Sequence, residues 1–447
     1  MHSTLHLLAI FFLFLTLTLF SNAAVPPRNR FKFVNNPSLT GDYDVEYDAS
    51  YTLSSISAGA FQLAFYNTTP GAFSLALRMG SSDPRTIYYG NKFYVPRWVW
   101  EANRGKPVGA MATFQLLANG NLVITEADGS VAWQTNTANK DVVKFELLPN
   151  GNMVLINSKG AYVWQSFDTA TDTLLAGQGF KLGGLTKLVS RASATDNSNN
   201  GPYSLEMDKE TLVLYYTSPA SGKKYAYYSF DDRFNTLTGS LETVTFKCSP
   251  QTDENFAYNL YLSYTVTDKS FFGSPVLIRP NWNVTYSMLR LGVDGSLKIF
   301  TFYAPVERTK WEMTYSLFSE PFAGGCQLPE KCGKFGLCEN EMCVGCPAET
   351  GAKAWSSSCQ PKTVSAVACA KKSFKFYKMV GVDHFMSGFM QGENVSESGC
   401  GSKCSSDCKC AGYFYHQADK KCWVAYDLKT LTRNGNSTHI GYIKVPK

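Results

Sequence analysis

The sequence LLANGNLVITEADGSVAWQTN, from Leu116 to Asn136, recurs 31 residues later as LLPNGNMVLINSKGAYVWQSF, from Leu147 to Phe167. The two copies align without a gap, and a fixed period of this kind is typical of repeated supersecondary units. In each copy an Asn-Gly pair lies between short apolar runs. This dipeptide favours a tight hairpin turn, because both of its residues tolerate a positive φ. The repeat therefore predicts β-hairpin units.

A third, weaker copy precedes these two. The segment Val99–Asn103 matches the Trp-Gln-Thr-Asn end of the first copy at a spacing of 33 residues. The three copies then end on Trp100, Trp133 and Trp164. Three sheets that each end on a large aromatic residue could bury the three indoles together on one axis. The pattern predicts a threefold β architecture.

Two motifs carry a family resemblance. The segment Trp98–Arg104 (WVWEANR) resembles the VVWVANR signature of S-locus glycoproteins, and Trp164–Leu175 (WQSFDTATDTLL) resembles their WQSFDxPTDTLL. The threefold unit resembles the bulb-type mannose-binding lectin domain, a β-prism. With no kinase domain, the chain is most similar to the plant epidermis-specific secreted glycoproteins. The resemblance covers nearly the whole mature chain.

This resemblance implies a mainly β chain, in which tandem bulb-lectin β-prism domains precede small disulfide-rich EGF-like and PAN/apple (α+β) modules. The length also suggests roughly two to four domains. The expected boundaries are 1–23 for a signal peptide, 24–46 for an N-terminal extension, 47–167 for the bulb-type lectin domain, 168–320 for a second, degenerate lectin-like domain, 321–361 for the EGF-like module and 369–445 for the PAN/apple domain.

The first 23 residues have the features of a signal peptide. An apolar run of 16 residues, Leu5 to Phe20, is followed by small residues at Ser21 and Ala23, which suit signal peptidase. The run is shorter than a membrane-spanning helix needs. Because no Lys or Arg precedes it, an uncleaved anchor stays as the alternative. Cleavage is expected after Ala23 or Ala24.

Several features favour a secreted protein. The chain ends in a polar segment rather than a removable hydrophobic tail. Four Asn-x-Ser/Thr triplets without proline at x are candidate N-glycosylation sites. They begin at Asn67, Asn283, Asn394 and Asn436. We expect a glycoprotein of the extracellular space and cell wall, with no membrane span after signal cleavage.

The composition is that of an ordered globular protein, with 44% hydrophobic, 14% aromatic and 17% charged residues. The net charge of +6 is mild for this length, and no cluster of five or more Lys or Arg occurs. Nucleic acid is therefore not an expected partner. The positive charge could favour weak retention on an acidic polysaccharide matrix.

The cysteines concentrate near the C-terminus. Six of them fall within 34 residues and predict an EGF-like disulfide module with 15 possible connectivities, at Cys326, Cys332, Cys338, Cys343, Cys346 and Cys359. A zinc half-site at Cys343-x-x-Cys346 is disfavoured, because secreted thiols are normally oxidised and no second pair at metal spacing follows. Cys248 is the odd cysteine, either a buried thiol or an intermolecular link. We favour the buried thiol, since Phe246 shares its strand face.

The last module combines a helix with short strands. Cys400, Cys404 and Cys408 have helical spacing, so they form one stripe. Cys410 and Cys422 each open a β-like run. A helix linked by disulfide bonds to a small sheet resembles the PAN/apple module. The resemblance implies the disulfides Cys400–Cys422 and Cys404–Cys410, and Cys369–Cys408 only as the remaining pair.

No enzyme motif is present. The mature chain has only His384, His416 and His439, all in the PAN-like module, so the lectin-like domains contain no imidazole general base. HExxH, G-x-S-x-G and Walker patterns are missing. Asp231-Asp232 is more typical of a solvated turn than of a glycosidase pair. We expect no catalytic residue, no cofactor and no metal site.

The bulb-type sugar motif reads Gln-x-Asp-x-Asn-x-Val-x-Tyr. Its positions fall on Leu117, Asn119, Asn121, Val123 and Thr125 in the first copy, and on Leu148, Asn150, Asn152, Val154 and Ile156 in the second. The resemblance therefore makes four asparagines the candidate sugar-binding residues of degenerate sites: Asn119, Asn121, Asn150 and Asn152. Gln has become Leu, Asp has become Asn and Tyr is lost. Each unpaired sugar hydroxyl costs roughly 1–3 kcal/mol, so we expect hairpin turns rather than working mannose pockets.

The second lectin-like domain has a further degenerate match, which keeps Val213 and Tyr215 but has no acid. Two functions remain. One is a secreted lectin-like protein that binds cell-wall or glycoprotein glycans of the mannose type. The other is an extracellular interaction protein that docks on another secreted glycoprotein or enzyme and modulates it.

Overall fold

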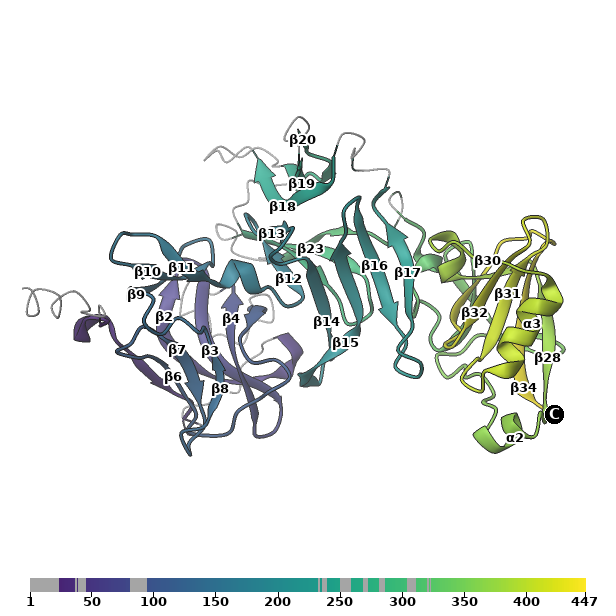
Figure 1. Cartoon of the computed structure of the whole chain (residues 1–447), viewed down its shortest axis with the longest axis horizontal. Coiled ribbons are helices and arrows are strands. Elements are labelled where there is room, and N and C mark those ends of the chain that lie inside the picture. Colours follow the sequence, from purple (N-terminus) through teal and green to yellow (C-terminus); the bar gives the residue numbers. More distant parts are fainter. Residues whose placement is uncertain are drawn as a thin grey trace, which may run out of the picture. The chain divides into compact units, whose positions relative to one another are not determined.

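The computed structural model describes most of the chain. The described residues are 24–36, 38, 46–80, 95–231, 234, 239–249, 259–267, 272–280, 286–303, 311–319, 321 and 323–447. The expected signal peptide and the sequon at Asn283 lie outside them. Strands dominate (Figure 1), and the chain divides into two compact units, Met1–Thr169 with Thr195–Ser198 and Ala170–Ala194 with Asn199–Lys447. None of the helices in the described ranges is long and apolar enough to cross a membrane.

Three antiparallel sheets build the first unit. Their strand orders are β2-β3-β4-β5, β1-β6-β7-β8 and β11-β10-β9. The strands are β1 (Lys32–Val34), β2 (Ser50–Ala58), β3 (Phe61–Thr69), β4 (Ala72–Met79), β5 (Arg97–Glu101), β6 (Thr113–Leu116), β7 (Leu122–Thr125), β8 (Val131–Gln134), β9 (Val142–Leu147), β10 (Met153–Asn157) and β11 (Tyr162–Gln165). The expected threefold β architecture is confirmed. Residues 32–34 of the expected N-terminal extension belong to this fold, because β1 pairs with β6.

The three sheets meet at three tryptophans. Trp100 on β5, Trp133 on β8 and Trp164 on β11 form edge-to-face pairs with centroid distances of 6.1, 6.4 and 5.9 Å. This geometry places the positive edge of one ring against the negative face of the next. The Trp100 Nε1–H also donates to the Thr169 carbonyl at 3.1 Å. The repeated Trp thus closes the unit at its centre.

The second unit begins with another three-sheet arrangement, as tandem β-prisms predict. The sheet orders are β14-β15-β16-β17, β13-β18-β19-β20 with β21 beside β19, and β12-β22-β23-β24. The strands are β12 (Thr173–Leu175), β13 (Gly179–Lys181), β14 (Lys187–Ser193), β15 (Asp196–Met207), β16 (Leu212–Thr217), β17 (Lys224–Ser229), β18 (Leu241–Ser249), β19 (Asn259–Val266), β20 (Phe272–Gly273), β21 (Val276–Ile278), β22 (Tyr286–Leu291), β23 (Leu297–Phe302) and β24 (Trp311–Ser316). Buried residues of all three sheets share one core, including Leu214, Phe246 and Ile299.

The disulfide-rich part follows in the same unit. It contains β25 (Phe335–Glu339), β26 (Met342–Ala348) and β27 (Gly351–Lys353). The structure selects one of the fifteen connectivities: Cys326–Cys338, Cys332–Cys343 and Cys346–Cys359. Strand β25 pairs in parallel with β33 (Lys429–Arg433) of the last module. The expected EGF-like and PAN/apple parts therefore share a sheet, which runs β27-β26-β25-β33-β29 with β29 at Val382–His384.

The last module packs helix α3 (Glu397–Ser406) on a sheet of order β28-β34-β31-β32-β30. Its strands are β28 (Phe374–Val380), β30 (Glu393–Asn394), β31 (Gly412–His416), β32 (Lys421–Ala425) and β34 (His439–Pro446), and a short helix α2 (Ala366–Ala370) precedes them. Ser396 caps α3 by accepting from the Gly399 N–H. The disulfides are Cys369–Cys408, Cys400–Cys422 and Cys404–Cys410.

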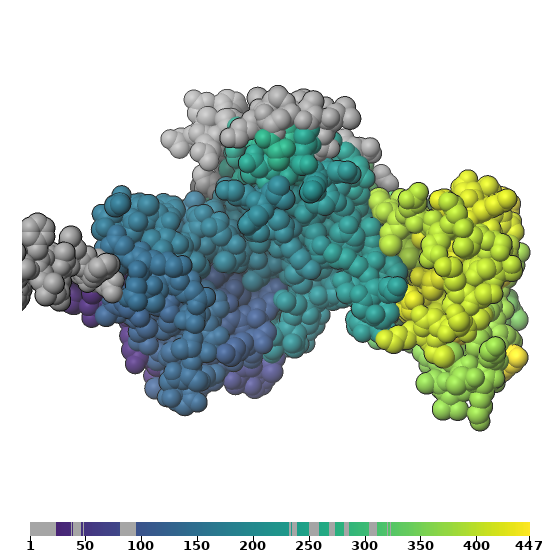
Figure 2. All heavy atoms as spheres, in the orientation of Figure 1, coloured from purple at the N-terminus to yellow at the C-terminus, as the bar shows by residue number. Residues whose placement is uncertain are grey.

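This module is anchored to the strands of the second lectin-like part. Phe385 lies edge to face with Tyr216 and Tyr227, at centroid distances of 6.2 and 6.4 Å. The Tyr426 N–H donates to the Tyr225 hydroxyl at 3.3 Å. Figure 2 shows the yellow-green residues of the module in contact with the teal strands β16 and β17. The contact between them is therefore largely aromatic.

Candidate functional site

The first Asn-Gly-Asn turn uses its asparagines internally. The Asn121 side chain is buried, and its Nδ2 donates to Gln134 Oε1 at 2.8 Å. Its Oδ1 accepts from the Thr137 N–H at 3.1 Å. The Asn121 N–H donates to Asn119 Oδ1 at 3.0 Å. Gly120 between them has a φ of 85°, and a Cβ there would lie 2.8 Å from the Val142 Cβ, so glycine is required.

The second turn repeats this network. The Asn152 side chain is buried, and its Nδ2 donates to Gln165 Oε1 at 2.9 Å. Its Oδ1 accepts from the Phe167 N–H at 3.2 Å. The Asn152 N–H donates to Asn150 Oδ1 at 3.1 Å. Both buried amides therefore have donors and acceptors occupied within the fold.

Sequence reasoning missed the glutamine partners. Gln134 and Gln165 coincide in the repeat, and that coincidence was the available signal.

The remaining motif positions offer little to a sugar. Thr125 shares a hydrogen bond of 2.8 Å with Thr113, and Ile156 is buried. Only Asn119 and Asn150 are exposed among the four candidate asparagines.

The degenerate match of the second lectin-like part lies on β15 and β16. Val213 is buried, and Tyr215 is half-buried beneath the Lys224 ammonium, which lies 4.2 Å from the ring centroid. Burial, followed by the charges of Asp208 and Glu206, raises the pKa of Tyr215. Its neighbour Tyr216 is fully buried. In this match, the Lys224 ammonium covers a face of the Tyr215 ring, so that face is not available to a sugar.

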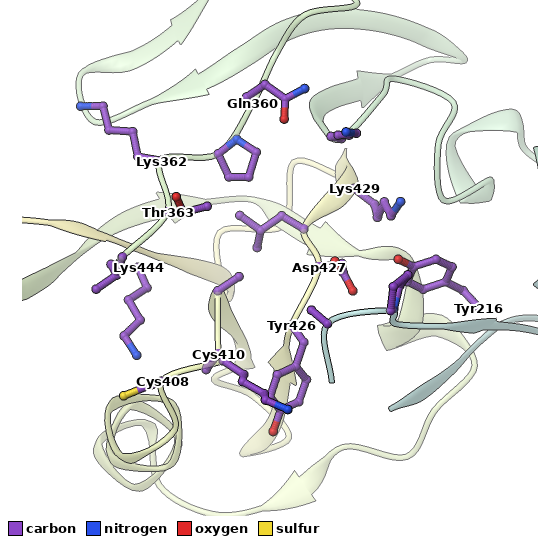
Figure 3. Close-up of a pocket in the computed structure, with 18 residues that line it drawn as sticks. Tyr216, Gln360, Lys362, Thr363, Cys408, Cys410, Tyr426, Asp427, Lys429 and Lys444 are labelled. Atoms are coloured by element: carbon purple, nitrogen blue, oxygen red, sulfur yellow. The ribbon is translucent and has the colours of Figure 1, made fainter. Parts of the chain in front are cut away.

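A pocket of about 470 Å³ lies in the second unit (Figure 3), where several segments distant in sequence meet. They are the end of β16 and the residues after it, residues 360–364 before the last module, residues 408–411 between α3 and β31, and residues 426–429 between β32 and the start of β33, with Lys334 and Lys444 beside them. Its lining residues include five lysines, at positions Lys334, Lys362, Lys409, Lys429 and Lys444. Asp427 is its one acidic residue. The pocket is therefore predominantly basic.

Three of these lysines have partners. Lys429 pairs with Glu330, and Lys362 lies 3.4 Å from Glu349. Lys444 is buried, and its Nζ donates to the carbonyls of Cys404 and Asp407 at 3.1 and 3.0 Å. Burial lowers the pKa of Lys444, and the charge of Asp407 opposes this. Lys444 thus provides hydrogen-bond donors for the carbonyl groups at the C-terminal end of α3.

The other two lysines are exposed. Across the described part of the chain, Lys334 and Lys409 have no carboxylate within salt-bridge distance. A polar acceptor is also present: Asp427 Oδ2 is buried and has no hydrogen-bond donor among the described residues. Figure 3 shows Asp427 directed toward Tyr216. Burial, and then the charges of Asp427 and Glu330, raise the pKa of Tyr216.

The Tyr426 ring completes the wall. Its hydroxyl donates to Asp407 Oδ2 at 2.7 Å. Burial and this hydrogen bond raise the pKa of Tyr426 to about 12. Pocket-lining apolar atoms come from Pro219, Ala220, Pro361, Val364 and Leu428. The pocket combines two exposed ammonium groups with an aromatic wall, which is a suitable environment for a polar, anionic ligand.

The candidate glycosylation sites differ in exposure. Asn394 and Asn436 are exposed in the last module. Asn67 on β3 is only 9% exposed, and its Nδ2 donates to the Thr69 carbonyl at 3.0 Å. Asn283 lies outside the described residues.

The three histidines of the mature chain lie in the last module. His384 is buried, and its Nε2 lies 2.9 Å from the Asp427 carbonyl. Burial lowers the pKa of His384 to about 4. His416 and His439 lie against Asp383. Among the described residues, these three side chains form a group that could hold a metal ion.

Comparison with known proteins agrees with this architecture. The D-mannose binding lectin family matches residues 97–194, and the S-locus glycoprotein domain family matches residues 237–354. These matches and the fold define the class: a bulb-type lectin-like glycoprotein with a disulfide-rich C-terminal part.

Full-length relatives identify the particular family. EP1-like glycoprotein 3 of Arabidopsis thaliana is 43% identical over 437 residues, which cover 96% of each chain. Epidermis-specific secreted glycoprotein EP1 of Daucus carota is 48% identical over 379 residues, covering 81% of this chain and 94% of that protein. A G-type lectin S-receptor-like serine/threonine-protein kinase of Arabidopsis thaliana is only 25% identical, over 86% of this chain and 44% of the kinase. The chain belongs to the EP1-like glycoprotein family.

Proposed function

We propose that this chain is a secreted, N-glycosylated lectin-like protein of the apoplast and cell wall, and that it binds an acidic saccharide in the lysine-lined pocket of its second unit. Secretion is supported by the name of the carrot relative, by the apolar N-terminal run and by six disulfides, which persist in oxidising compartments. We propose no catalytic role, since the pocket lining has one carboxylate and no histidine.

The observation that carries this proposal is the presence of two exposed lysines in one cavity, neither of which has a carboxylate within salt-bridge distance among the described residues. The ammonium groups of Lys334 and Lys409 suit the carboxylate of a uronic acid. The Asp427 carboxyl also lines this cavity, but its Oδ2 is buried from solvent and the carboxyl already interacts with Tyr216, so the proposal rests on the lysines. The Tyr426 ring forms an aromatic wall of the pocket, and the Lys223 ammonium lies 5.9 Å from its centroid.

We propose that the Asn-Gly-Asn turns are structural and that they do not bind mannose-type glycans. A sugar hydroxyl at Asn121 or Asn152 has to displace a hydrogen bond to Gln134 or Gln165. Exchanging one internal hydrogen bond for one to ligand yields little net free energy. The saccharide site therefore lies away from the repeat that defines the fold.

Glycan binding of the secreted protein tests this proposal. Immobilised polygalacturonic acid and yeast mannan are compared in the same buffer, and we expect retention on polygalacturonic acid alone, weakening as salt rises. The double variant Lys334→Ala/Lys409→Ala should bind at least ~10-fold more weakly. The matched control is Lys140→Ala/Lys159→Ala, which removes two exposed lysines of the first unit and the same total charge. Equal losses in both variants indicate nonspecific attraction and contradict the pocket.

A second candidate function is docking on another extracellular protein. Three large apolar side chains are exposed on or beside the small disulfide-rich strands: Met342 at 64%, Val344 at 39% and Trp355 at 42%. Exposed apolar surface on a rigid module is typical of protein interfaces. If no saccharide on a glycan array binds, and capture of secreted partners depends on Met342 and Trp355, this function replaces saccharide binding.

A further inference from the structure

Asp383, His416 and His439 form a compact cluster at the edge of the last module. His416 Nε2 lies 2.7 Å from Asp383 Oδ1, and His439 Nδ1 lies 2.7 Å from Asp383 Oδ2. The three ligand atoms all lie within 4.8 Å of one another. The side chains are 15%, 11% and 21% exposed in that order, so the cluster is held by the fold but open to solvent.

Strands rather than loops position the cluster. His416 ends β31 and His439 begins β34, and the two residues are direct partners in the antiparallel register. Their rings stack with centroids 3.5 Å apart and planes at 13°. Asp383 comes from β29 of the neighbouring sheet. A site built on sheet backbone holds its ligands in place before the ion arrives.

His439 Nδ1 has two neighbours that require different hydrogen positions. Asn434 Nδ2 lies 2.9 Å from His439 Nδ1 and also contacts Asp383 Oδ2. The amide orientation is set by the Asn436 N–H, which donates to Asn434 Oδ1 at 2.9 Å. Since an amide nitrogen only donates, Asn434 requires a lone pair on His439 Nδ1, whereas the adjacent carboxylate oxygen requires a proton there. One nitrogen cannot satisfy both.

A metal ion bound to both His439 and Asp383 removes the need for a proton between them. We propose that Asp383, His416 and His439 form a binding site for one divalent transition-metal ion of the zinc class. The ion takes the lone pairs of His416 Nε2 and His439 Nδ1 together with an Asp383 oxygen, and Asn434 keeps its hydrogen bond to the carboxylate as a positioning residue. Two imidazoles and one carboxylate leave a fourth position for water or a ligand group.

The present distances permit this with small movements. A tetrahedral ion with bonds of about 2.1 Å holds its ligand atoms roughly 3.4 Å apart, so the 2.7 Å pairs must open by roughly 0.7 Å. Both histidine side chains must move, and their stacked rings must tilt so that Nε2 of His416 and Nδ1 of His439 face one ion. Calcium and magnesium do not suit the site, because they select all-oxygen ligand sets.

The site is independent of the saccharide pocket, since neither histidine nor Asp383 lines that cavity. Binding would link β29 of one sheet to β31 and β34 of the other. An ion that binds the folded chain alone stabilises it by mass action. The site therefore goes beyond the proposed function and can be tested without any glycan.

Calorimetric titration of the full-length secreted protein with ZnCl₂ tests the site. The protein carries no histidine tag and is first stripped with a chelator. We expect one ion per chain, a higher melting temperature with ZnCl₂, and no response to CaCl₂. His416→Gln and His439→Gln should each weaken binding at least ~10-fold. Asp419→Asn, an exposed carboxylate in the β31–β32 hairpin, is the matched control and should bind as wild type.

Wild-type protein alone can overturn the proposal. If the wild-type protein does not bind zinc stoichiometrically, the cluster only links its strands by hydrogen bonds, and the proposal is wrong. X-ray absorption of the zinc-loaded wild type should show two imidazole nitrogens, and a spectrum without them contradicts the site even if the variants fail to fold. Binding that survives both histidine substitutions in folded protein also contradicts it.

Discussion

The indole of Trp133 lies edge to face against the indole of Trp100, with centroids 6.1 Å apart and planes at 81°. The two residues come from different sheets, and Trp164 of the third sheet contacts both. Each indole therefore stabilises the association of all three sheets. The cluster is the structural counterpart of the sequence repeat.

Replacing one member of this cluster should destabilise the first unit. We expect Trp133→Ala to cost about 2–3 kcal/mol of unfolding free energy, at the lower end for tryptophan because Trp133 is half-buried. Urea unfolding followed by fluorescence measures this. Tyr162→Ala is the control, since Tyr162 lies on the same sheet as Trp164 but is 52% exposed, and its cost should be within about 0.5 kcal/mol. Equal costs for both variants disprove a central role of the indoles.

The turn asparagines should affect stability rather than sugar binding. Asn152→Ala leaves Gln165 and the Phe167 N–H without their partner, so we expect a cost of about 1–3 kcal/mol. Asn119→Asp keeps an acceptor for the Asn121 N–H and should be nearly neutral. Wild-type protein should pass through mannose-agarose without retention. Retention that is lost in an Asn121→Ala/Asn152→Ala variant would restore these turns as a sugar site.

Lys444 should be required for the stability of the last module. Lys444→Met keeps the aliphatic stem but removes the donors to the Cys404 and Asp407 carbonyls at the end of α3. We expect a loss of about 2–3 kcal/mol, because these buried acceptors then have no partner. Thermal unfolding compares it with Lys378→Met, an exposed lysine on β28. A small effect of Lys444→Met would mean that water replaces the ammonium group.

Non-reducing peptide mapping should recover six linked pairs, including Cys400–Cys422 and Cys404–Cys410. Cys248 should remain a thiol in a monomer. It is half-buried on β18 and packs against the same core as fully buried Phe246, which limits its access to a second chain. A denaturing gel of wild type and Cys248→Ser should show the same monomer. A dimer that disappears on reduction and in Cys248→Ser contradicts this.

Local chemistry made much of the fold predictable. The Asn-Gly turns, the strands that end on Trp133 and Trp164, and the helix that carries Cys400 and Cys404 all depend on neighbours a few residues away. The spacing of turn residues and apolar residues is visible in one dimension. The repeat also made a meeting of the three indoles on one axis possible, because threefold equivalence places equivalent residues around one axis.

Tertiary structure alone decided the sites. The β25–β33 pair joins Phe335 to Lys429, the pocket combines Lys334 with Asp427, and the metal cluster brings Asp383 to His439. None of these contacts follows from local spacing, since each depends on the register of strands that pair across long stretches of chain. The sequence by itself determined the repeated β units and their turns, whereas long-range strand pairing determined which charges share a cavity and which histidines share a carboxylate.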